Sequence, residues 1–558
     1  MLKSIFKNSF IIFSRRQTNI LSAAFVIMIT YGASMILGIF RERLLVSYFF
    51  ACCRSSLDAY YAAFRLPDLV FQIVAVGALS AAFIPVFSDL LVKNESQAYR
   101  LASSVINFLL LFFLLLSCLI FAFARPLSAT ITGFSPDQVI LMANMTKVML
   151  AAQGLFLISN FFSAIIQSNQ RFLIPALSPV FYNLGIIAAI ILFTPFLGIW
   201  APVLGVVLGA FLHLALQIPL AFRLGFSYRP ILDKKMPQAA EVFRLMLPRT
   251  LALAVYQIEA TVTVFLATSL AAGSLTIFYL AQRLMDLPVR LFGTPIGQAA
   301  LPALSSQKSK EDMKGFRETL ISSLNQILYL ALPAMALILI LRVPLVRLAY
   351  GTKTFPWQAT LLTARTVGIF SLAIVSQAVI QLLVRGFYAL HDTKTPFLIG
   401  SLSVLLSVFL AIYLTFGRAW GILGLAAATS VSGLFQALSL TLILFKRLPE
   451  VPSFALIKNW LKMGGATLLT AIFLWLPMRF LDRFVLDTTK TVNLLILTLL
   501  ASLIGFSVYL ALSLVLGVTE VFSFARLIRR LGQWQEVFKE SEEMLAPQSD
   551  HQEPALNR

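Results

Sequence analysis

Charged side chains lie inside apolar stretches of this sequence, and their spacing places several of them on common helix faces. In "SLDAYYAAFRLPDLVFQI" (56–73), Asp58 and Arg65 are seven residues apart, and Asp68 lies close to the same stripe. Positions seven apart face nearly the same direction, because an α-helix has 3.6 residues per turn. A charge at mid-membrane costs at least about 2.5–3.5 kcal/mol, so it usually faces a bundle interior or a wet cavity.

The arginines of these stretches have the chemistry of an anion-binding site. Arg283 and Arg290 repeat the spacing of seven, with Asp286 alongside. Guanidinium groups stay charged and match phosphate oxygens bidentately. The sequence therefore predicts a cavity for a phosphorylated, amphiphilic substrate. Its predicted substrate-binding residues are Arg41, Arg65, Arg283, Arg290 and Arg249. The alternative is that these arginines snorkel, or pair with Asp68 and Asp286 as structural clamps.

Four acidic residues are predicted to have gating or structural roles. They are Asp58, Asp68, Glu259 and Asp286. Glu259 corresponds to Arg41 at the offset of an internal repeat, which suggests an ion pair between the two halves that could latch one state of a transporter. The alternative is that Glu259 pairs with a neighbour in its own half. Arg41 is followed by Glu42 and Arg43, well inside an apolar run.

The composition places the whole chain in a membrane. Of 558 residues, 59% are hydrophobic and 12% are charged, and the mean hydropathy is +0.87. Three cysteines and three histidines are scattered and predict neither a disulfide framework nor a metal cluster. No H-E-x-x-H, G-x-G-x-x-G or Walker motif is found, so we expect a protein that is not an enzyme. A net charge of +20 is typical of basic cytoplasmic loops rather than of nucleic-acid binding here.

Apolar runs long enough to span a bilayer number about fourteen. They are 20–45, 57–88, 101–124, 138–165, 173–194, 198–222, 238–270, 275–304, 317–342, 358–386, 396–415, 419–445, 457–478 and 492–516. Loops on one side carry most of the Lys and Arg, which predicts that both termini are cytoplasmic. Residues 520–544 read either as an amphipathic surface helix or as a solvated tail.

An internal repeat divides the spans into two copies of six. "SLDAYYAAFRLPDL" (56–69) aligns with "SLTIFYLAQRLMDL" (274–287), and two further matches follow in the same order. Six spans return the chain to the same side, so the repeats are parallel. The predicted parts are a cytoplasmic segment (1–19), two lobes (20–222 and 238–445), a pair of C-terminal helices (457–516) and a cytoplasmic tail (517–558).

Four segments resemble the MurJ/MviN family of lipid II flippases, in the multidrug/oligosaccharidyl-lipid/polysaccharide exporter superfamily. They are "RLPDLVFQIVAVGALSAAFIPVFSDL" (65–90), "SNQRFLIPALSPVFYN" (168–183), "YLAQRLMDLPVRLFG" (279–293) and "RGFYALHDTKTPF" (385–397). The resemblance implies a V-shaped pair of six-helix lobes around a cationic cavity in the bacterial inner membrane. It implies that the last two helices hold the lipid tail, that Arg41 and Arg283 grip the pyrophosphate, and that Asp58 lies near the outer gate. The implied partners are lipid II, membrane lipids and cell-wall synthesis proteins.

The sequence departs from the family at three positions. Met35 replaces an arginine, and Phe71 and Gln72 replace a basic pair. Gln72 corresponds to Arg290 in the repeat, so we expect Arg290 to compensate. No cofactor is expected; Na⁺ or H⁺ coupling and the membrane potential are the energy sources considered. The alternatives are an exporter of another polyprenyl-pyrophosphate oligosaccharide, a multidrug antiporter, and a membrane scaffold for cell-wall enzymes.

Overall fold

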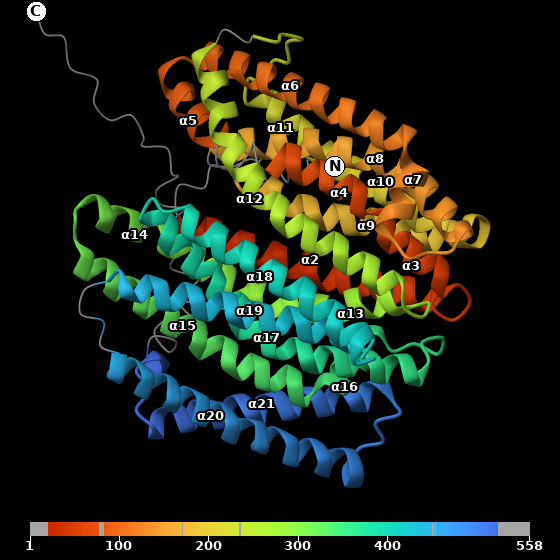
Figure 1. The fold of residues 1–558 in the computed structure, drawn as a ribbon, viewed down its shortest axis with the longest axis vertical. Helices are drawn as coiled ribbons and strands as arrows, with labels where there is room; N and C mark the ends of the chain where they lie inside the picture. The colour runs from red at the N-terminus through yellow and green to blue at the C-terminus, as the bar shows by residue number, and fades with distance from the viewer. Residues whose placement is uncertain are drawn as a thin grey trace, which may run out of the picture.

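The computed structural model describes residues 20–76, 83–169, 171–233, 236–448, 451 and 453–522. Within these ranges every regular element is a helix, which confirms the all-α fold (Figure 1). Ten described helices are long and apolar enough to cross a membrane. The other four predicted spans fall on α2, on α3 to α5, on α12 and on α13 to α14, so fourteen spans are compatible with the structure. The predicted segment 1–19 and nearly all of the tail lie outside the described residues.

The first half of the chain runs from α2 to α11. Its helices are α2 (Ile20–Phe49), α3 (Arg54–Ala63), α4 (Arg65–Phe71), the π-helical η1 (Gln72–Val76), α5 (Ile84–Lys93), α6 (Glu95–Ala122), α7 (Ala124–Ile131), α8 (Pro136–Ser168), α9 (Leu173–Leu197), α10 (Trp200–Ala215) and α11 (Ile218–Arg223).

The second half runs from α12 to α19, and a further pair of helices follows it. The helices are α12 (Pro237–Thr268), α13 (Ser274–Pro288), the π-helical η3 (Val289–Gly293), α14 (Thr294–Ser309), α15 (Met313–Ile340), α16 (Arg342–Tyr350), α17 (Trp357–Ala389), α18 (Lys394–Ile412), η4 (Tyr413–Gly417) and α19 (Ile422–Lys446). The pair comprises α20 (Ser453–Phe480), extended by η5 (Leu481–Val485), and α21 (Thr491–Val515).

The two halves have the same order of helices. In each, the second span is interrupted by a π-helical segment, η1 or η3. In each, a short helix, α7 or α16, precedes a helix of 33 residues, α8 or α17. The first helix of each half packs against the fifth span of its own half, α2 against α9 and α12 against α18. A common folding pattern therefore underlies the sequence repeat.

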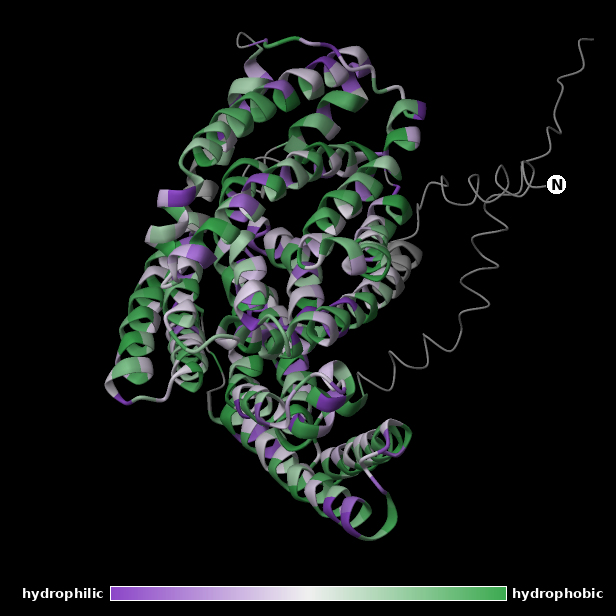
Figure 2. Ribbon diagram, turned by 90° about the vertical axis from the view of Figure 1, so that its right-hand side faces the viewer, coloured by the Kyte–Doolittle hydropathy of each residue, from purple (hydrophilic) through white to green (hydrophobic). Residues whose placement is uncertain are grey.

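The helices carry apolar side chains outward, as a bilayer requires. Figure 2 shows hydrophobic residues along the outer faces of the bundle. The α20–α21 pair is the clearest case: it packs against α15, and outward leucines such as Leu461, Leu468 and Leu503 are 62–71% exposed. Lipid tails solvate such faces as well as a protein core does, so exposure there is not a packing defect.

Candidate functional site

An ionic cluster is built around two residues of α2. Arg41 and Glu42 are 8% and 0% exposed. The Arg41 guanidinium donates from Nη2 to Glu42 Oε1 at 2.6 Å and from Nη1 to Asn183 Oδ1 on α9 at 3.0 Å. Its Nε is buried and has no hydrogen-bond partner among the described residues. The cluster is therefore anchored within the first half but retains one unused donor.

Glu42 joins the two halves. Its Oε1 also contacts Arg283 Nε on α13 at 3.0 Å, and its Oε2 accepts a hydrogen bond from the Tyr61 hydroxyl on α3. One carboxylate thus holds an arginine from each half. No role for Glu42 was predicted, although it is an acid next to Arg41 inside an apolar run.

The predicted pair between Arg41 and Glu259 is not formed in this structure. Arg41 pairs with Glu42, whereas the Glu259 carboxyl accepts a hydrogen bond from Ser407 on α18. Glu259 therefore contacts a neighbour within its own half, as the alternative interpretation held. An ion pair between the halves does exist, but it is formed by Glu42 and Arg283.

A cavity of about 490 Å³ lies against this cluster. Its charged lining residues are Arg41, Glu42, Asp68 and Arg283. Aromatic rings, including Tyr60, Tyr182 and Tyr279, form much of its wall. The described lining therefore carries two positive and two negative side chains, where a cationic lining was expected.

Two polar residues of the lining come from other helices of the first half. Asp68 on α4 accepts a hydrogen bond at Oδ1 from Gln153 Nε2 on α8, at 2.5 Å. His213 on α10 is 7% exposed, and its Nδ1 lies 2.6 Å from Ser159 Oγ. Sequence spacing identified Asp68, but nothing in the sequence distinguished His213 as a lining residue.

The family departures at Phe71 and Gln72 fall on this cavity. Both residues line it, so the cations that the family has there are missing from the lining here. Met35 lies on α2, partly buried, and is not among the lining residues.

Arg65 lies between the halves rather than in the cavity. Its Nη2 donates to the carbonyl oxygen and to Oε1 of Gln257, both at 2.6 Å, and its Nε donates to Thr261 Oγ1 at 2.9 Å. Both partners lie on α12. The predicted substrate-binding residue therefore connects α4 to the first helix of the second half.

Arg290 is not brought to the cavity. It lies on η3, its side chain is 69% exposed, and Asp286 is its ion-pair partner at 3.7 Å. The lining contains neither residue, so the predicted compensation for Gln72 is not supported. Arg249 lies on α12, and its side chain falls outside the described residues.

The end of the molecule beyond the cavity is closed by Asp58. Its carboxylate, 2% exposed, accepts hydrogen bonds from Gly273 N at 2.6 Å and from Thr276 N and Oγ1 at 2.8 and 2.6 Å. It therefore binds the first turn of α13, where a negative charge is favourable. Gly273 has φ 94°, and a Cβ there would approach the Phe50 ring to 3.2 Å, so glycine is required.

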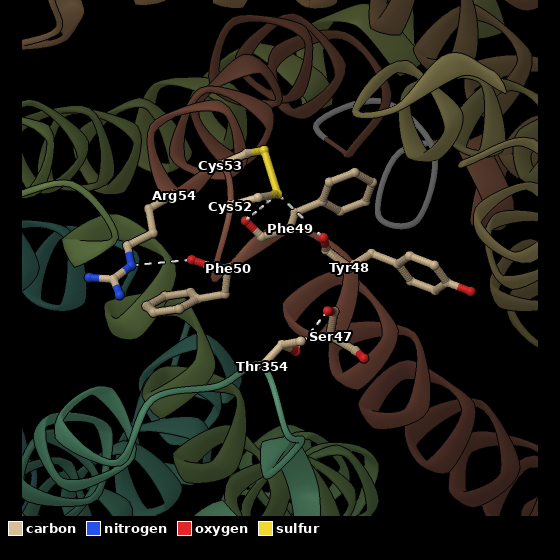
Figure 3. Close-up of a disulfide and its surroundings, with 8 residues drawn as sticks. All are labelled: Ser47, Tyr48, Phe49, Phe50, Cys52, Cys53, Arg54 and Thr354. Atoms are coloured by element: carbon tan, nitrogen blue, oxygen red, sulfur yellow. Dashed lines mark hydrogen bonds between the residues drawn. A yellow bond between two sulfur atoms is a disulfide. The ribbon is translucent and has the colours of Figure 1, made fainter. Parts of the chain in front are cut away.

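Figure 3 shows the turn between α2 and α3 at this closed end. The Phe50 ring packs edge-on against the Phe355 ring, with 4.8 Å between the ring centroids. Thr354 Oγ1 donates a hydrogen bond to the Ser47 carbonyl oxygen at 2.7 Å. Cys52 and Cys53 form a disulfide within the turn, which the sequence analysis did not expect.

A short helix, α16, adds two contacts at the same end. Arg43 Nη1 on α2 donates to the Leu348 carbonyl at 2.6 Å. One residue earlier on α16, Arg347 Nη2 donates to the Thr488 carbonyl in the α20–α21 turn, also at 2.6 Å. The helix is thus bonded to the first half and to the C-terminal pair.

The segment "RGFYALHDTKTPF" has a structural role. Asp392 Oδ1 accepts hydrogen bonds from the backbone N–H groups of Lys394 and Thr395, both at 3.0 Å, at the start of α18. Its Oδ2 accepts from Thr395 Oγ1 and from Arg447 Nη1, both at 2.5 Å. This segment therefore caps a helix and lies outside the cavity lining.

Asp392→Asn is expected to destabilise the fold at neutral pH by about 0.5–2 kcal/mol, as loss of a helix cap does. Partial burial raises the pKa of Asp392, but hydrogen bonds from Thr395 and Arg447 outweigh it and lower the pKa from 3.8 to about 2. A lowered folded-state pKa stabilises the fold above the unfolded value, and the gain is lost as the pH falls from about 4 to 2. The unfolding temperatures of wild type and Asp392→Asn should converge as the pH falls through that window. A difference that does not change with pH would show that the Asp392 carboxylate does not stabilise the start of α18.

The family model "Lipid II flippase MurJ" matches residues 45–495. A probable lipid II flippase MurJ of Bdellovibrio bacteriovorus is 28% identical over 527 residues, covering 91% of this chain and 97% of its own. The lipid II flippase MurJ of Burkholderia cenocepacia is 27% identical over 453 residues, covering 78% of this chain and 86% of its own.

Two solved structures have a fold similar to that of this chain. A lipid II flippase MurJ in an inward closed conformation superposes with a TM-score of 0.72 at 26% identity, covering 88% of this chain and 98% of its own. An inward-facing multidrug transporter of the MATE family has a TM-score of 0.61 at 13% identity, which shows a shared fold. The family model spans most of the chain, and the segments that suggested the resemblance fall within it. The chain therefore belongs to the lipid II flippase MurJ family.

Proposed function

We propose that this protein moves lipid II, the undecaprenyl-pyrophosphate-linked peptidoglycan precursor, from the inner to the outer leaflet by alternating access. The observation that carries the proposal is the meeting of Arg41 and Arg283, one from each half, on a single carboxylate beside the cavity. A pyrophosphate bound there would contact both halves at once. Binding can then be coupled to their relative movement, because a ligand shifts an equilibrium by its differential contacts with the two states.

The remaining lining suits the other parts of the cargo. Sugar rings pack well on aromatic side chains such as those of Tyr60, Tyr182 and Tyr279. The apolar outer faces of α20 and α21 offer a path for the polyprenyl tail. A cavity of about 490 Å³ is in the usual range for small-ligand sites, and it holds part of the head group.

Membership of the family implies a multi-pass protein of the bacterial inner membrane. We place both termini in the cytoplasm, because the loops on that side carry most of the Lys and Arg. In this orientation the end closed by Asp58 faces outward. The described conformation would then be the one that holds the outer exit shut.

We propose that transport is coupled to protons through Glu259. This acid lies in the second half of α12, and its carboxyl contacts Ser407 of α18. An ionisable residue inside a membrane span is costly, and such residues usually mark a functional site. Ser407 is its described partner, whereas a Na⁺ site requires several oxygen ligands. The membrane potential acts on the proton that Glu259 carries.

The test uses the full chain in vesicles that contain fluorescent lipid II. Flipping should be stimulated by a pH gradient in wild type, whereas Glu259→Gln should bind lipid II but lose the stimulation. Glu241→Gln, at an exposed acid on the same helix, is the control. A Glu259→Gln protein that still responds to the gradient would exclude Glu259 as the coupling site.

A second cargo is favoured by the neutral residues at Phe71 and Gln72, which line the cavity where the family has cations. A related exporter would carry another polyprenyl-pyrophosphate oligosaccharide. Vesicles that contain either lipid distinguish the two: flipping of the oligosaccharide lipid but not of lipid II would overturn the first proposal. A scaffold that recruits cell-wall enzymes would flip neither lipid.

A further inference from the structure

A network of buried neutral side chains in the first half fixes the orientation of Gln217. This residue is 0% exposed at the start of α11, and its amide lies 3.0 Å from Ser178 Oγ. The Ser178 hydroxyl donates its hydrogen to the Ile174 carbonyl oxygen at 2.9 Å, so it can only accept from Gln217. The amide nitrogen, Nε2, therefore faces Ser178, and the same nitrogen donates to Ser159 Oγ at 3.0 Å.

The tautomer of His213 follows from this orientation. Ser159 Oγ accepts from Gln217 and has one hydrogen to donate, and His213 Nδ1 lies 2.6 Å from it. Gln217 Nε2 is also 3.4 Å from Nδ1, so two donors converge on this ring nitrogen. Nδ1 is therefore the acceptor, and the neutral ring carries its proton on Nε2.

The Nε2–H group of His213 is left for a ligand. His213 lines the cavity, and its Nε2 has no hydrogen-bond partner among the described residues. This nitrogen is not one of the described polar atoms that are both fully buried and unpartnered, so it is accessible from the cavity. A donor on the wall of a mostly aromatic cavity is suited to fixing one oxygen of a bound molecule.

Two more neutral polar side chains line the cavity with His213. Asn160 Nδ2 donates to the Phe156 carbonyl oxygen at 2.8 Å, and Asn160 Oδ1 accepts no hydrogen bond from the described residues. The Gln72 side chain adds a second amide. The Phe156 ring packs edge-on against His213, with 5.2 Å between the ring centroids. Neutral donors and acceptors beside aromatic rings suit a sugar, whose hydroxyl groups both donate and accept hydrogen bonds.

Aromatic rings connect this neutral part of the wall to the arginines. The Phe156 ring also packs edge-on against Tyr182, with 4.9 Å between the ring centroids. The Arg41 guanidinium lies over the Tyr182 ring, 6.0 Å from its centroid. A pyrophosphate that is held by Arg41 and Arg283 would therefore leave the sugar attached to it free to lie along these rings and reach His213.

We propose that His213, with its proton on Nε2, donates a hydrogen bond to an oxygen of the sugar attached to the pyrophosphate, and so favours the glycosylated lipid over the bare carrier lipid. This inference rests on the proposed transport of a pyrophosphate-linked lipid. Asn160 Oδ1 accepts a hydrogen bond from a hydroxyl or amide group of the same sugar. A neutral donor suits this role, because a cation in its place would attract the pyrophosphate of either lipid.

Equilibrium binding of two lipids to the purified full chain tests the proposal: lipid II, and undecaprenyl pyrophosphate, which has no sugar. Wild type should bind lipid II more tightly. His213→Asn reaches the Nδ1 position but not the Nε2 position. It should weaken lipid II binding about 3- to 10-fold, the effect of one neutral hydrogen bond, and leave binding of undecaprenyl pyrophosphate unchanged.

Two further variants separate this role from a structural one. The amide nitrogen of His213→Gln can reach the Nε2 position, so this variant should retain most of the lipid II binding. His391→Asn is the matched control, because His391 is exposed and lies outside the described lining. Its φ of 59° is a conformation that asparagine tolerates, so the control should behave as wild type.

Each other result overturns a defined part of the argument. An equal loss of both lipids in His213→Asn would show that His213 does not act through the sugar. A loss in His213→Gln as large as in His213→Asn would exclude the Nε2–H group as the donor. Wild type that binds the two lipids equally would show that the sugar is not recognised, and would leave lipid II transport intact. Failure of wild type to bind lipid II under any condition would overturn the proposed function itself.

Discussion

Replacing Arg283 by alanine is expected to abolish growth of a bacterium that depends on this chain for lipid II export. The Arg283 side chain is 47% exposed and uses Nε to contact Glu42, so the rest of its guanidinium is available to a ligand. A hydrogen bond to a charged group contributes about 1.5–3 kcal/mol, so its loss should weaken pyrophosphate binding about 10- to 100-fold. Arg41→Ala should act in the same direction and also leave Glu42 with one arginine fewer.

The measurement is complementation in a strain whose own lipid II flippase can be shut off, together with the amount of lipid II exposed on the outer leaflet. Arg290→Ala is the control, since Arg290 lies outside the cavity lining and pairs with Asp286. It should rescue growth at equal expression. Rescue by Arg283→Ala, or failure of Arg290→Ala, would show that the pyrophosphate does not bind where the two halves meet.

Neutralising Glu42 should destabilise the protein strongly. Glu42→Gln keeps the shape of the side chain but removes the charge that Arg41 and Arg283 share. Removing one partner of a buried ion pair costs about 3–5 kcal/mol, because the remaining charge is left uncompensated. We therefore expect a marked loss of thermal stability and weaker closure between the halves.

Thermal unfolding of the purified protein measures the first effect, and cross-linking between cysteines introduced on α3 and α13 measures the second. Glu318→Gln is the control: its side chain is 62% exposed and pairs with Arg317 at 3.9 Å. Exposed pairs contribute about 0–1 kcal/mol, so this variant should resemble wild type. A Glu42→Gln protein as stable as that control would show that the ion pairs of Glu42 do not stabilise the protein.

The helical fold and part of the site could be predicted because both depend on local pattern. Apolar runs and the repeated segments indicated the two halves; helical spacing identified Arg283 as a candidate, and the position of Arg41 inside an apolar run identified Arg41. Glu42 was missed because its partner Arg283 lies far away in sequence, and spacing along one helix does not report contacts between helices. Arg65 was assigned to the cavity because helical spacing predicts the face of the helix on which a side chain lies. Spacing does not predict which other helix that face contacts.

The error at Arg290 shows what a repeat cannot predict. Gln72 and Arg290 correspond in the repeat and lie in the two π-helical segments, yet Gln72 lines the cavity and Arg290 does not. The second half contributes only Tyr279 and Arg283 to the described lining, so the two halves surround the cavity unequally. Correspondence within the repeat therefore did not predict which side chain reaches the cavity.

The two hydrogen bonds of α16 connect the first half to the C-terminal helices at the closed end. Leu348 is held by Arg43 of α2, and the neighbouring Arg347 holds the turn between α20 and α21 at Thr488. If α2 withdraws and the first bond persists, α16 is pulled with it and the C-terminal helices are drawn along. If the first bond breaks, α16 stays with the C-terminal pair and α2 moves alone. In the first case the head group and the polyprenyl tail would change leaflets in one concerted step. In the second case they would change leaflets in two separate steps.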